Sequence, residues 1–458
     1  MARMAFPMNA NDIIERITGR LFRLNEPLMA RCKNVIRRHL YQLLINQREP
    51  GYPPPSSPIR AVFLVNYPAM WPSLQSIFER MSADACFDPI IVTLPTHAHG
   101  TVELGSNESN FQYFSQYGNQ VQRGFDESTG CWLDLRSIKP DLAFVITPYD
   151  AYPEYHSRSL SHQTRLCYVP YGIMSAKIQD NQFNRPFHYR CWRIFCETQI
   201  HKELFAKYSS VDQRKIVVSG YPKLDWYRND RRIEGDRLWP VTIGKPMKRV
   251  VWAPHWSIPL RGARKHWLNF STFHRNHLYF LEAMKNTQSS INWLFKPHPA
   301  LASRVVRSGL MSNFEFQCYM DEMLSLPNVI QCRESEYLDY FATSDALITC
   351  SVSFLSEYLP TGKPILRLDN PDNVRFNEFG DRLIEHLYRA QSVAEIDAFL
   401  QTVVLNGHDP LLEARLQTLR EVLYFPKHHI GGWIKDYLKV ELEAAQGSME
   451  AAAGGSFC

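Results

Sequence analysis

The sequence predicts two doubly wound α/β domains in tandem, each Rossmann-like, preceded by a basic helical segment. Two observations lead to this prediction. Short continuous apolar runs recur along the chain, as expected of parallel strands that are buried on both faces. Stretches with helical spacing of apolar residues lie between most of these runs, and strands that alternate with helices form parallel sheets.

The first segment, residues 1–50, is basic and helical in pattern. It holds nine Lys/Arg against four Asp/Glu, whereas the rest of the chain has 42 of each sign. Pro27 is expected to open the second of two helices. We expect the helices to pack on the body of the protein, with a basic face that can also contact an anionic membrane surface. No basic groove with interleaved aromatic residues follows, so nucleic acid is not expected as a partner.

A proline-rich linker, residues 51–59, leads into the first domain, which is expected over residues 60–240. Helices fit between its strands, for example at Trp71–Ser82 and Ile200–Tyr208. Six apolar runs are expected to be its strands: Ala61–Val65, Pro89–Pro95, Asp141–Pro148, Leu166–Gly172, Arg193–Thr198 and Lys215–Pro222.

The second domain is expected over residues 245–425, followed by a C-terminal helix within 426–446 that crosses back over the first domain. The tail, 447–458, is of low complexity and is expected to be disordered. The expected strands are Arg249–Pro254, Ile291–Pro297, Asn328–Gln331, Asp345–Cys350 and Pro364–Asp369, and the later helices are Val393–Val403, Leu411–Val422 and Gly432–Ala444.

Composition and motifs exclude several classes of protein. The chain is 45% hydrophobic and 21% charged, which is typical of a soluble protein, and it has neither a 20-residue apolar run nor a secretory h-region. Its ten cysteines form no CxxC pair, which favours the reducing cytoplasm. His97 and His99 have no acidic or cysteine partners at ligand spacing, so a metal is not expected. A GxGxxG motif is absent, so no dinucleotide cofactor is indicated.

Polar residues follow three strands of the second domain. Ala253–Trp256 ends the first strand, Lys296–Pro299 the next, and Cys350–Ser353 a later one. Ligands of open parallel sheets collect at the carboxyl ends of the strands. The imidazoles, ammonium group, hydroxyls and helix N-terminus expected there suit a phosphate.

The segment SDALITCSVSFLSEYLPTGKPILRLDN, residues 344–370, resembles the nucleotide-binding motif of GT-B transferases. More narrowly, it resembles the CDP-glycerol glycerophosphotransferase family, the teichoic-acid polymerases and their capsule and lipopolysaccharide relatives. Three further segments are similar to motifs of that family and occur in the same order: GYPKLD at 220–225, APHW at 253–256 and FKPHP at 295–299.

The resemblance implies a donor site in the second domain. Ser353 and Ser351, together with Lys296, would bind the phosphates of a nucleotide-activated donor, and Glu357 would accept hydrogen bonds from a ribose hydroxyl. Alanine at Ser353, Glu357 or His298 is expected to weaken transfer while leaving the fold intact.

Two histidines are the catalytic candidates that the resemblance implies. His298 would contact the donor diphosphate, where an N–H donor balances charge as the bond to the nucleotide breaks. His255 stands where the family commonly has threonine.

The chain departs from the family on the acceptor side, in the first domain. The family has a His-Gly pair whose histidine is thought to be the base, whereas Tyr171 and Gly172 occupy the matching turn here. An ordinary tyrosine titrates near pH 10, which is too high for an efficient base at neutral pH. His255, Asp150 and Glu197 are alternative bases, and the sequence does not choose among them.

The resemblance implies a transferase that moves a sugar or a polyol phosphate from a nucleotide-activated donor to a growing surface polysaccharide, such as a capsule, O-antigen or teichoic-acid-like polymer. The acceptor would be the polysaccharide or a lipid-linked precursor, in the cytoplasm or at the inner face of the membrane. The alternatives are a nonhydrolysing sugar-nucleotide epimerase of GT-B fold and a non-catalytic carbohydrate-binding paralogue.

Overall fold

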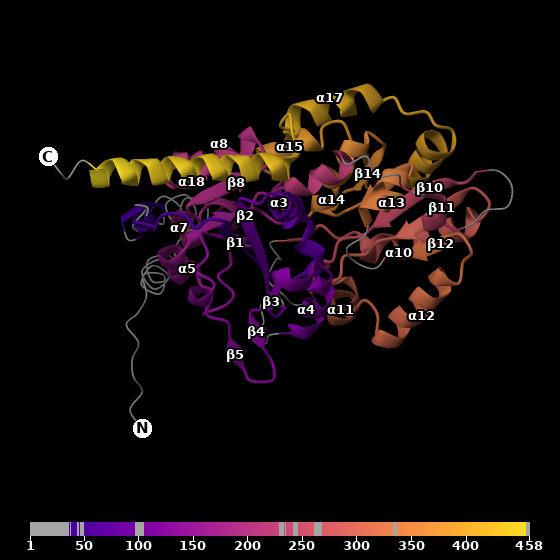
Figure 1. The fold of residues 1–458 in the computed structure, drawn as a ribbon. Coiled ribbons are helices and arrows are strands. Elements are labelled where there is room, and N and C mark those ends of the chain that lie inside the picture. The colour runs from indigo at the N-terminus through magenta and orange to yellow at the C-terminus, as the bar shows by residue number, and fades with distance from the viewer. Residues whose placement is uncertain are drawn as a thin grey trace. The chain divides into compact units, whose positions relative to one another are not determined.

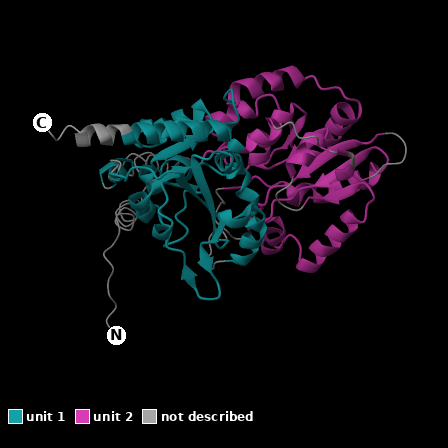
Figure 2. Cartoon of the chain, viewed as in Figure 1, with its two compact units in different colours: residues 1–171, 178–222, 425–458 teal, residues 172–177, 223–424 magenta. Residues whose placement is uncertain are grey.

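The computed structural model describes residues 36, 38–43, 45, 50–96, 105–228, 233, 235–240, 246–260, 268–332 and 337–454. The chain divides into two compact units (Figure 2). Unit 1 comprises residues 1–171, 178–222 and 425–458, and unit 2 comprises residues 172–177 and 223–424.

Within the described residues, unit 1 contains a seven-stranded parallel sheet with the order β3-β2-β1-β6-β7-β8-β9, and a small antiparallel pair, β4-β5 (Figure 1). The order reverses between β1 and β6, which are direct neighbours. The strands are β1 (Ile59–Val65), β2 (Phe87–Thr93), β3 (Val121–Arg123), β4 (Phe125–Asp126), β5 (Cys131–Trp132), β6 (Leu142–Val145), β7 (Arg165–Tyr168), β8 (Arg193–Cys196) and β9 (Ile216–Val218).

Helices connect the strands of unit 1, and the long C-terminal helix α18 (Ile430–Gly454) packs on α3 (Figure 1). Gly431 allows this close approach, because a side chain there would collide with the backbone of Ser76. Lys435 on α18 pairs with Asp84 at 2.6 Å. The other described helices of unit 1 include η1 (Pro68–Met70), α3 (Pro72–Ser82), α4 (Glu108–Phe114), η2 (Ser115–Gln120), η3 (Leu135–Ser137), α5 (Ser157–Gln163), α6 (Gln179–Phe183), α7 (Pro186–Arg190), α8 (Gln199–Tyr208) and η4 (Gln213–Lys215).

The two ends of the chain differ in how far the structure describes them. Helix α18 continues to Gly454, into the tail that was expected to be disordered; the Glu-Ala-Ala-Ala run there has high helix propensity.

Most of the basic segment 1–50 lies outside the described residues. In its described part, the Arg38 Nε–H donates to Ser210 Oγ at 2.8 Å and Tyr41 is buried beside Tyr189. This part of the segment therefore packs on unit 1.

Unit 2 has a six-stranded parallel sheet among its described residues, with the order β12-β11-β10-β13-β14-β15. The order reverses between β10 and β13. The strands are β10 (Lys248–Ala253), β11 (Ile291–Phe295), β12 (Val329–Gln331), β13 (Ala346–Thr349), β14 (Ile365–Leu368) and β15 (Tyr388–Ala390).

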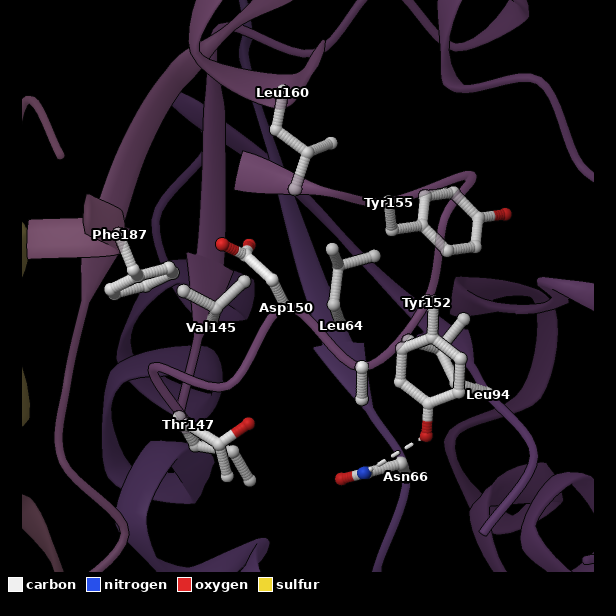
Figure 3. Close-up of a pocket in the computed structure, with 12 residues that line it drawn as sticks. Leu64, Asn66, Leu94, Val145, Thr147, Asp150, Tyr152, Tyr155, Leu160 and Phe187 are labelled. Carbon is white, nitrogen blue, oxygen red and sulfur yellow. Dashed lines mark hydrogen bonds between the residues drawn. The ribbon is translucent and has the colours of Figure 1, made fainter. Parts of the chain in front are cut away.

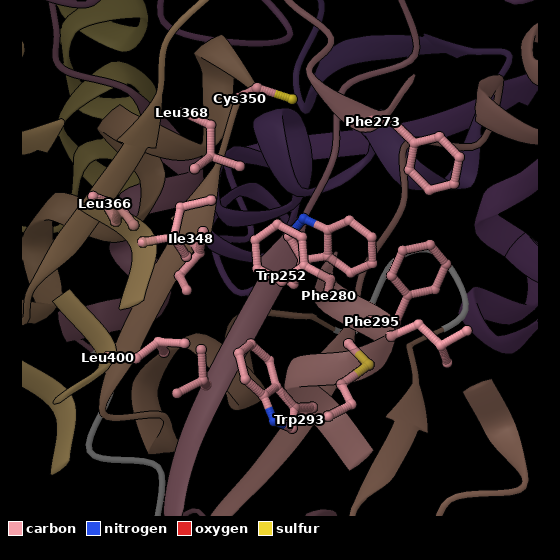
Figure 4. Packing of buried hydrophobic residues seen from close by; sticks show 14 of the residues in the cluster. Trp252, Phe273, Phe280, Trp293, Phe295, Ile348, Cys350, Leu366, Leu368 and Leu400 are labelled. Carbon is pink, nitrogen blue, oxygen red and sulfur yellow. The ribbon is translucent and has the colours of Figure 1, made fainter. Parts of the chain in front are cut away.

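The core of unit 2 lies between its sheet and helices and is rich in aromatic rings (Figure 4). Trp252 stacks on Phe280 with 4.2 Å between ring centroids, and Trp293 is fully buried beside them. The helices are η5 (Pro222–Arg228, which begins at the last residue of unit 1), α9 (Gly235–Leu238), α10 (Phe273–Asn286), α11 (Leu301–Arg307), α12 (Asn313–Leu324), α13 (Tyr337–Thr343), α14 (Val352–Tyr358), η6 (Leu359–Thr361), α15 (Glu378–Leu383), α16 (Val393–Ala398), the π-helical η7 (Phe399–Leu405) and α17 (Leu412–Val422).

The predicted α/β class with two parallel sheets is confirmed, and each expected apolar run overlaps an observed strand. The prediction missed the two-residue strands β4 and β5 and also β3 and β15, which are three-residue strands at sheet edges. Their sequences, VQR and YRA, lack the apolar run that identifies a strand buried on both faces. Among the described residues, no helix has both the length and the apolar composition of a membrane-spanning segment.

Candidate functional site

The candidate donor site lies at the carboxyl edge of the unit 2 sheet, where the strand order reverses. Crevices at such reversal points are the usual ligand sites of open α/β sheets. Thr349, the last residue of β13, ties the edge together: its hydroxyl donates to the Ala253 carbonyl (2.6 Å) and accepts from the Ser351 N–H (2.8 Å). The segments after β10, β11 and β13 therefore all begin at this edge, as the sequence predicts.

His255, after β10, is held as a neutral imidazole. Its Nδ1 accepts from the Ser257 N–H at 3.2 Å and lies 2.8 Å from the Ser257 hydroxyl. An Nδ1 that accepts a backbone N–H leaves the ring proton on Nε2. Burial, and secondarily the neighbouring His298, lower the pKa of His255 well below its usual value, so the ring stays neutral at physiological pH.

His298, after β11, is held in the same tautomer. Its Nδ1 accepts from the Ala300 backbone N–H at 3.1 Å, and the backbone N–H of His298 donates to the Pro254 carbonyl at 3.2 Å. The rings of His298 and His255 are 5.5 Å apart between centroids, and both are half-buried. The two imidazoles therefore lie at one edge of the sheet, each oriented by a backbone N–H at its Nδ1.

Trp256 joins this pair and was not identified as a site residue from the sequence, although it belongs to the APHW segment. Its ring centroid lies 6.0 Å from that of His298, and the Arg304 guanidinium lies over the ring at 5.4 Å. The Nε–H of Arg304 in turn donates to the Ile258 carbonyl at 2.7 Å. The indole is thus half-buried and clamped, which suits a flat surface on which a base or ring can stack.

Ser351 and Ser353 begin helix α14, after β13. Their hydroxyl oxygens are 3.5 Å apart, and among the described contacts the Ser351 side chain does not cap the helix. Hydroxyls that are not used for capping can donate to a ligand oxygen. The structure thus brings His255, His298, Ser351 and Ser353 to one edge of one sheet.

Glu357 is placed differently from the prediction. It is buried, and its carboxylate accepts from Lys223 Nζ at 2.9 Å and from the Tyr337 hydroxyl. The hydroxyl of Tyr227 donates to the Glu357 carbonyl oxygen at 2.7 Å. The carboxylate that was expected to hold a ribose hydroxyl is therefore engaged in a buried ion pair. Its partner, Lys223, lies in the GYPKLD segment, 134 residues away along the chain, which is why spacing alone did not reveal the pair.

Lys296 extends this cluster toward the edge of the sheet. Its side chain is buried, and its Nζ lies 5.3 Å from the centre of the Tyr337 ring, whereas Lys223 Nζ lies 4.6 Å from the same ring. Lys223, Lys296 and Glu357 thus lie around the same Tyr337 side chain.

Tyr171 and Gly172 lie in the loop after β7, and Tyr171 is the last residue of unit 1 before the chain enters unit 2 at Gly172. The Tyr171 carbonyl accepts from the hydroxyls of Tyr221 (2.7 Å) and Ser73 (3.2 Å). Burial, and secondarily Tyr149, raise the pKa of the Tyr171 phenol far above its usual range. This residue is therefore even less suited to be a base than an ordinary tyrosine.

Among the described residues, no cluster of three or more His, Cys, Asp or Glu side chains could hold a metal ion. His97 and His99 lie outside the described residues. Asp150 and Glu197, the other base candidates, follow β6 and β8 at the carboxyl edge of the unit 1 sheet.

Residues 175–371 match the family model described as CDP-Glycerol:Poly(glycerophosphate) glycerophosphotransferase. The matched segment contains the strand-end residues His255, His298 and Ser353 of unit 2. Among curated proteins, no sequence match is found.

Solved structures are similar over most of the chain. A protein described as a UDP-N-acetylglucosamine 2-epimerase, from Listeria monocytogenes, has a TM-score of 0.55 at 11% identity and covers 85% of this chain and 98% of its own. A variant of the wall teichoic acid polymerase TagF has a TM-score of 0.52 at 14% identity, with 97% and 100% covered. A TagF structure soaked with CDPG has a TM-score of 0.50 at 15% identity, with 96% and 99% covered. At these identities the likeness shows the fold, which is GT-B.

Proposed function

Because residues 175–371 match the model of the CDP-glycerol:poly(glycerophosphate) glycerophosphotransferase family, we propose that this GT-B transferase moves a polyol phosphate from a CDP-activated donor to a hydroxyl of a growing surface polysaccharide. The donor is a substrate, and neither a metal nor another cofactor takes part. The reaction takes place in the cytoplasm, at the inner face of the membrane.

The observation that carries this proposal is the convergence of two imidazoles and two serine hydroxyls at the carboxyl edge of the unit 2 sheet, inside the segment that the family model matches. His255 and His298 each accept a backbone N–H at Nδ1, which fixes the orientation of both rings. Preorganised donors stabilise the charge that develops on a diphosphate as the bond to the nucleotide breaks. Ser351 and Ser353 add hydroxyl donors, and Trp256 offers a face for the cytosine.

A panel of nucleotides tests the donor class. CMP and CDP are expected to raise the thermal unfolding temperature more than UDP, GDP or dTDP do. A ligand at a hundredfold its dissociation constant stabilises the folded state by about 2.7 kcal/mol. Release of CMP from CDP-glycerol in the presence of a poly(glycerol phosphate) primer then tests the reaction. Stabilisation by UDP alone, with conversion of UDP-N-acetylglucosamine in the absence of an acceptor, would favour the epimerase alternative.

Sugar transfer is favoured by one observation, the tyrosine at 171 where the family has histidine. We nevertheless expect Tyr171→His not to raise turnover with CDP-glycerol. The Tyr171 ring is desolvated next to Tyr149, and its carbonyl is held by Tyr221 and Ser73, so a shorter imidazole there loses packing without reaching an acceptor. The kcat values of the wild type, Tyr171→His and the control Tyr171→Phe with CDP-glycerol show whether a histidine at this position raises turnover. A clear gain with histidine would place the base at the end of β7.

Contact with an anionic membrane is a separate part of the proposal. Since Arg38 and Tyr41 contact unit 1, the test should remove residues 1–35 only. We expect this truncation to reduce binding to anionic liposomes, and wild-type binding to weaken with salt, because exposed charges are screened over about 8–10 Å at 0.1–0.15 M. Full-length protein with Gln at Arg16, Arg20 and Arg23 is the matched control for charge. Equal liposome binding by all three proteins would contradict a membrane role for this segment.

A further inference from the structure

A second polar site lies in unit 1, in a cavity at the carboxyl ends of β1, β2 and β6 (Figure 3). This is the point where the strand order of the unit 1 sheet reverses, between β1 and β6. The cavity has a volume of about 40 Å³, which is space for roughly three water-sized groups. A nucleotide or a whole sugar ring is too large for it, whereas a hydroxymethyl group fits.

Asp150 supplies the charge of this cavity, and it is held firmly. Its carboxylate accepts from the Ser157 N–H (2.7 Å) and the Ser157 hydroxyl (2.9 Å). His156 Nε2 lies 3.6 Å and Arg190 Nη1 3.9 Å from Oδ2. Because His156 Nδ1 accepts from the Arg158 N–H, its ring proton is on Nε2 and faces Asp150. Figure 3 shows the Asp150 side chain between Val145 and Leu64, with its carboxylate on the side of Phe187 and Leu160.

The remaining polar groups of the cavity include a hydrogen-bond acceptor. Asn66 uses its Nδ2–H to donate to the Tyr152 hydroxyl (3.0 Å), which itself donates to the Pro95 carbonyl. The side-chain Oδ1 of Asn66 therefore lies on the opposite side of the amide from Tyr152 and faces Thr147 (Figure 3). Among the described lining residues there is no lysine or arginine. A cavity with carboxylate, amide and hydroxyl oxygens suits hydroxyl donors and disfavours a phosphate.

We propose that this cavity binds the terminal hydroxymethyl group of the acceptor and that Asp150 is the general base, an inference that rests on the proposed function. The acceptor oxygen forms a bond to the phosphorus that carries the polyol. The bond from that phosphorus to the oxygen of CMP breaks, and CMP leaves with the electron pair. The hydroxyl proton moves to the Asp150 carboxylate.

The other candidate bases are placed less well. Glu197 is buried, pairs with His201 at 3.9 Å and does not line the cavity. His255 belongs to unit 2, where its Nδ1 is already used and Nε2 carries the proton. Each carboxylate oxygen of Asp150, in contrast, can accept a further hydrogen bond from a substrate hydroxyl.

Two substitutions of Asp150 separate catalysis from folding. The backbone of Asp150 has φ of 48°, which asparagine and glycine adopt most readily, so Asp150→Asn and Asp150→Gly keep the local conformation. The matched control is Asp134→Asn, because Asp134 also accepts the N–H of a turn and pairs with an arginine but does not line the cavity. Transfer from CDP-glycerol to a poly(glycerol phosphate) primer and the Kd of CMP are measured for each, with urea midpoints as a check of folding.

We expect both Asp150 variants to lose transfer by about 10²–10⁴-fold with an unchanged Kd for CMP, and the control to retain it. Formate, which can enter the space that glycine leaves, should restore transfer in Asp150→Gly at least tenfold and leave the wild type unaffected. A carboxylate that only caps α5 would not be rescued in this way. Turnover of the Asp150 variants within threefold of the wild type would overturn the inference and leave the proposed function standing. A wild-type protein that binds no CMP and shows no transfer would contradict both the proposed function and the role of Asp150.

Discussion

Replacing His298 with alanine is expected to lower the rate of transfer from CDP-glycerol by about 10²–10³-fold. Removal of one preorganised donor to a developing oxyanion has this effect in other enzymes, where it amounts to about 2.7–4 kcal/mol of transition-state stabilisation. His298 is half-buried, and its Nδ1 bond to the Ala300 N–H fixes the ring with Nε2 as the donor. Single-turnover rates with saturating CDP-glycerol measure the effect directly.

The fold should survive this change. Loss of the Ala300 hydrogen bond is expected to lower the free energy of unfolding by about 1 kcal/mol. His386→Ala is the matched control, since this half-buried imidazole of unit 2 also makes a hydrogen bond through Nδ1, to the Thr418 hydroxyl at 2.9 Å. Ser353→Ala is expected to weaken transfer as well. Wild-type transfer in both His298→Ala and Ser353→Ala would show that the donor binds elsewhere.

Replacing Glu357 with alanine is expected to lower the free energy of unfolding by about 3–5 kcal/mol, because the charge of Lys223 would stay buried without its partner. The transfer activity of this variant is expected to fall together with its free energy of unfolding. The sequence-based expectation that this substitution leaves the fold intact is therefore revised, since it treated Glu357 as a side chain that faces the ligand. Urea denaturation followed by fluorescence measures the change.

Replacing both members of the ion pair with apolar side chains separates the effect of the unpaired charge from the effect of the lost contact. Lys223→Met combined with Glu357→Leu should be far less destabilising than Glu357→Ala alone, because neither charge is then buried unpaired. The surface pair Lys285–Glu282, at 2.7 Å, is the control: Glu282→Ala should cost less than about 1 kcal/mol. A loss of less than 1 kcal/mol for Glu357→Ala would contradict a buried ion pair at this position.

Much of the fold was predictable because its physical origin is local. A strand buried on both faces must be a continuous apolar run, so β10, β11 and β13 can be recognised from their own residues. Edge strands such as β3 and β15 carry no such signal. The tail followed its local helix propensity as far as Gly454, and low complexity was a poor guide there.

The order of residues along the chain sets which strand ends carry imidazoles and hydroxyls, and parallel strands then bring those ends to one edge. What each side chain does there depends on contacts that form only in the folded protein. The tautomers of His255 and His298 depend on the backbone groups that their Nδ1 atoms meet. The pairing of Glu357 with Lys223, and the cavity around Asp150, join segments that lie far apart along the chain. Such distances are set by how sheets and helices pack, which the spacing of residues in a sequence does not contain.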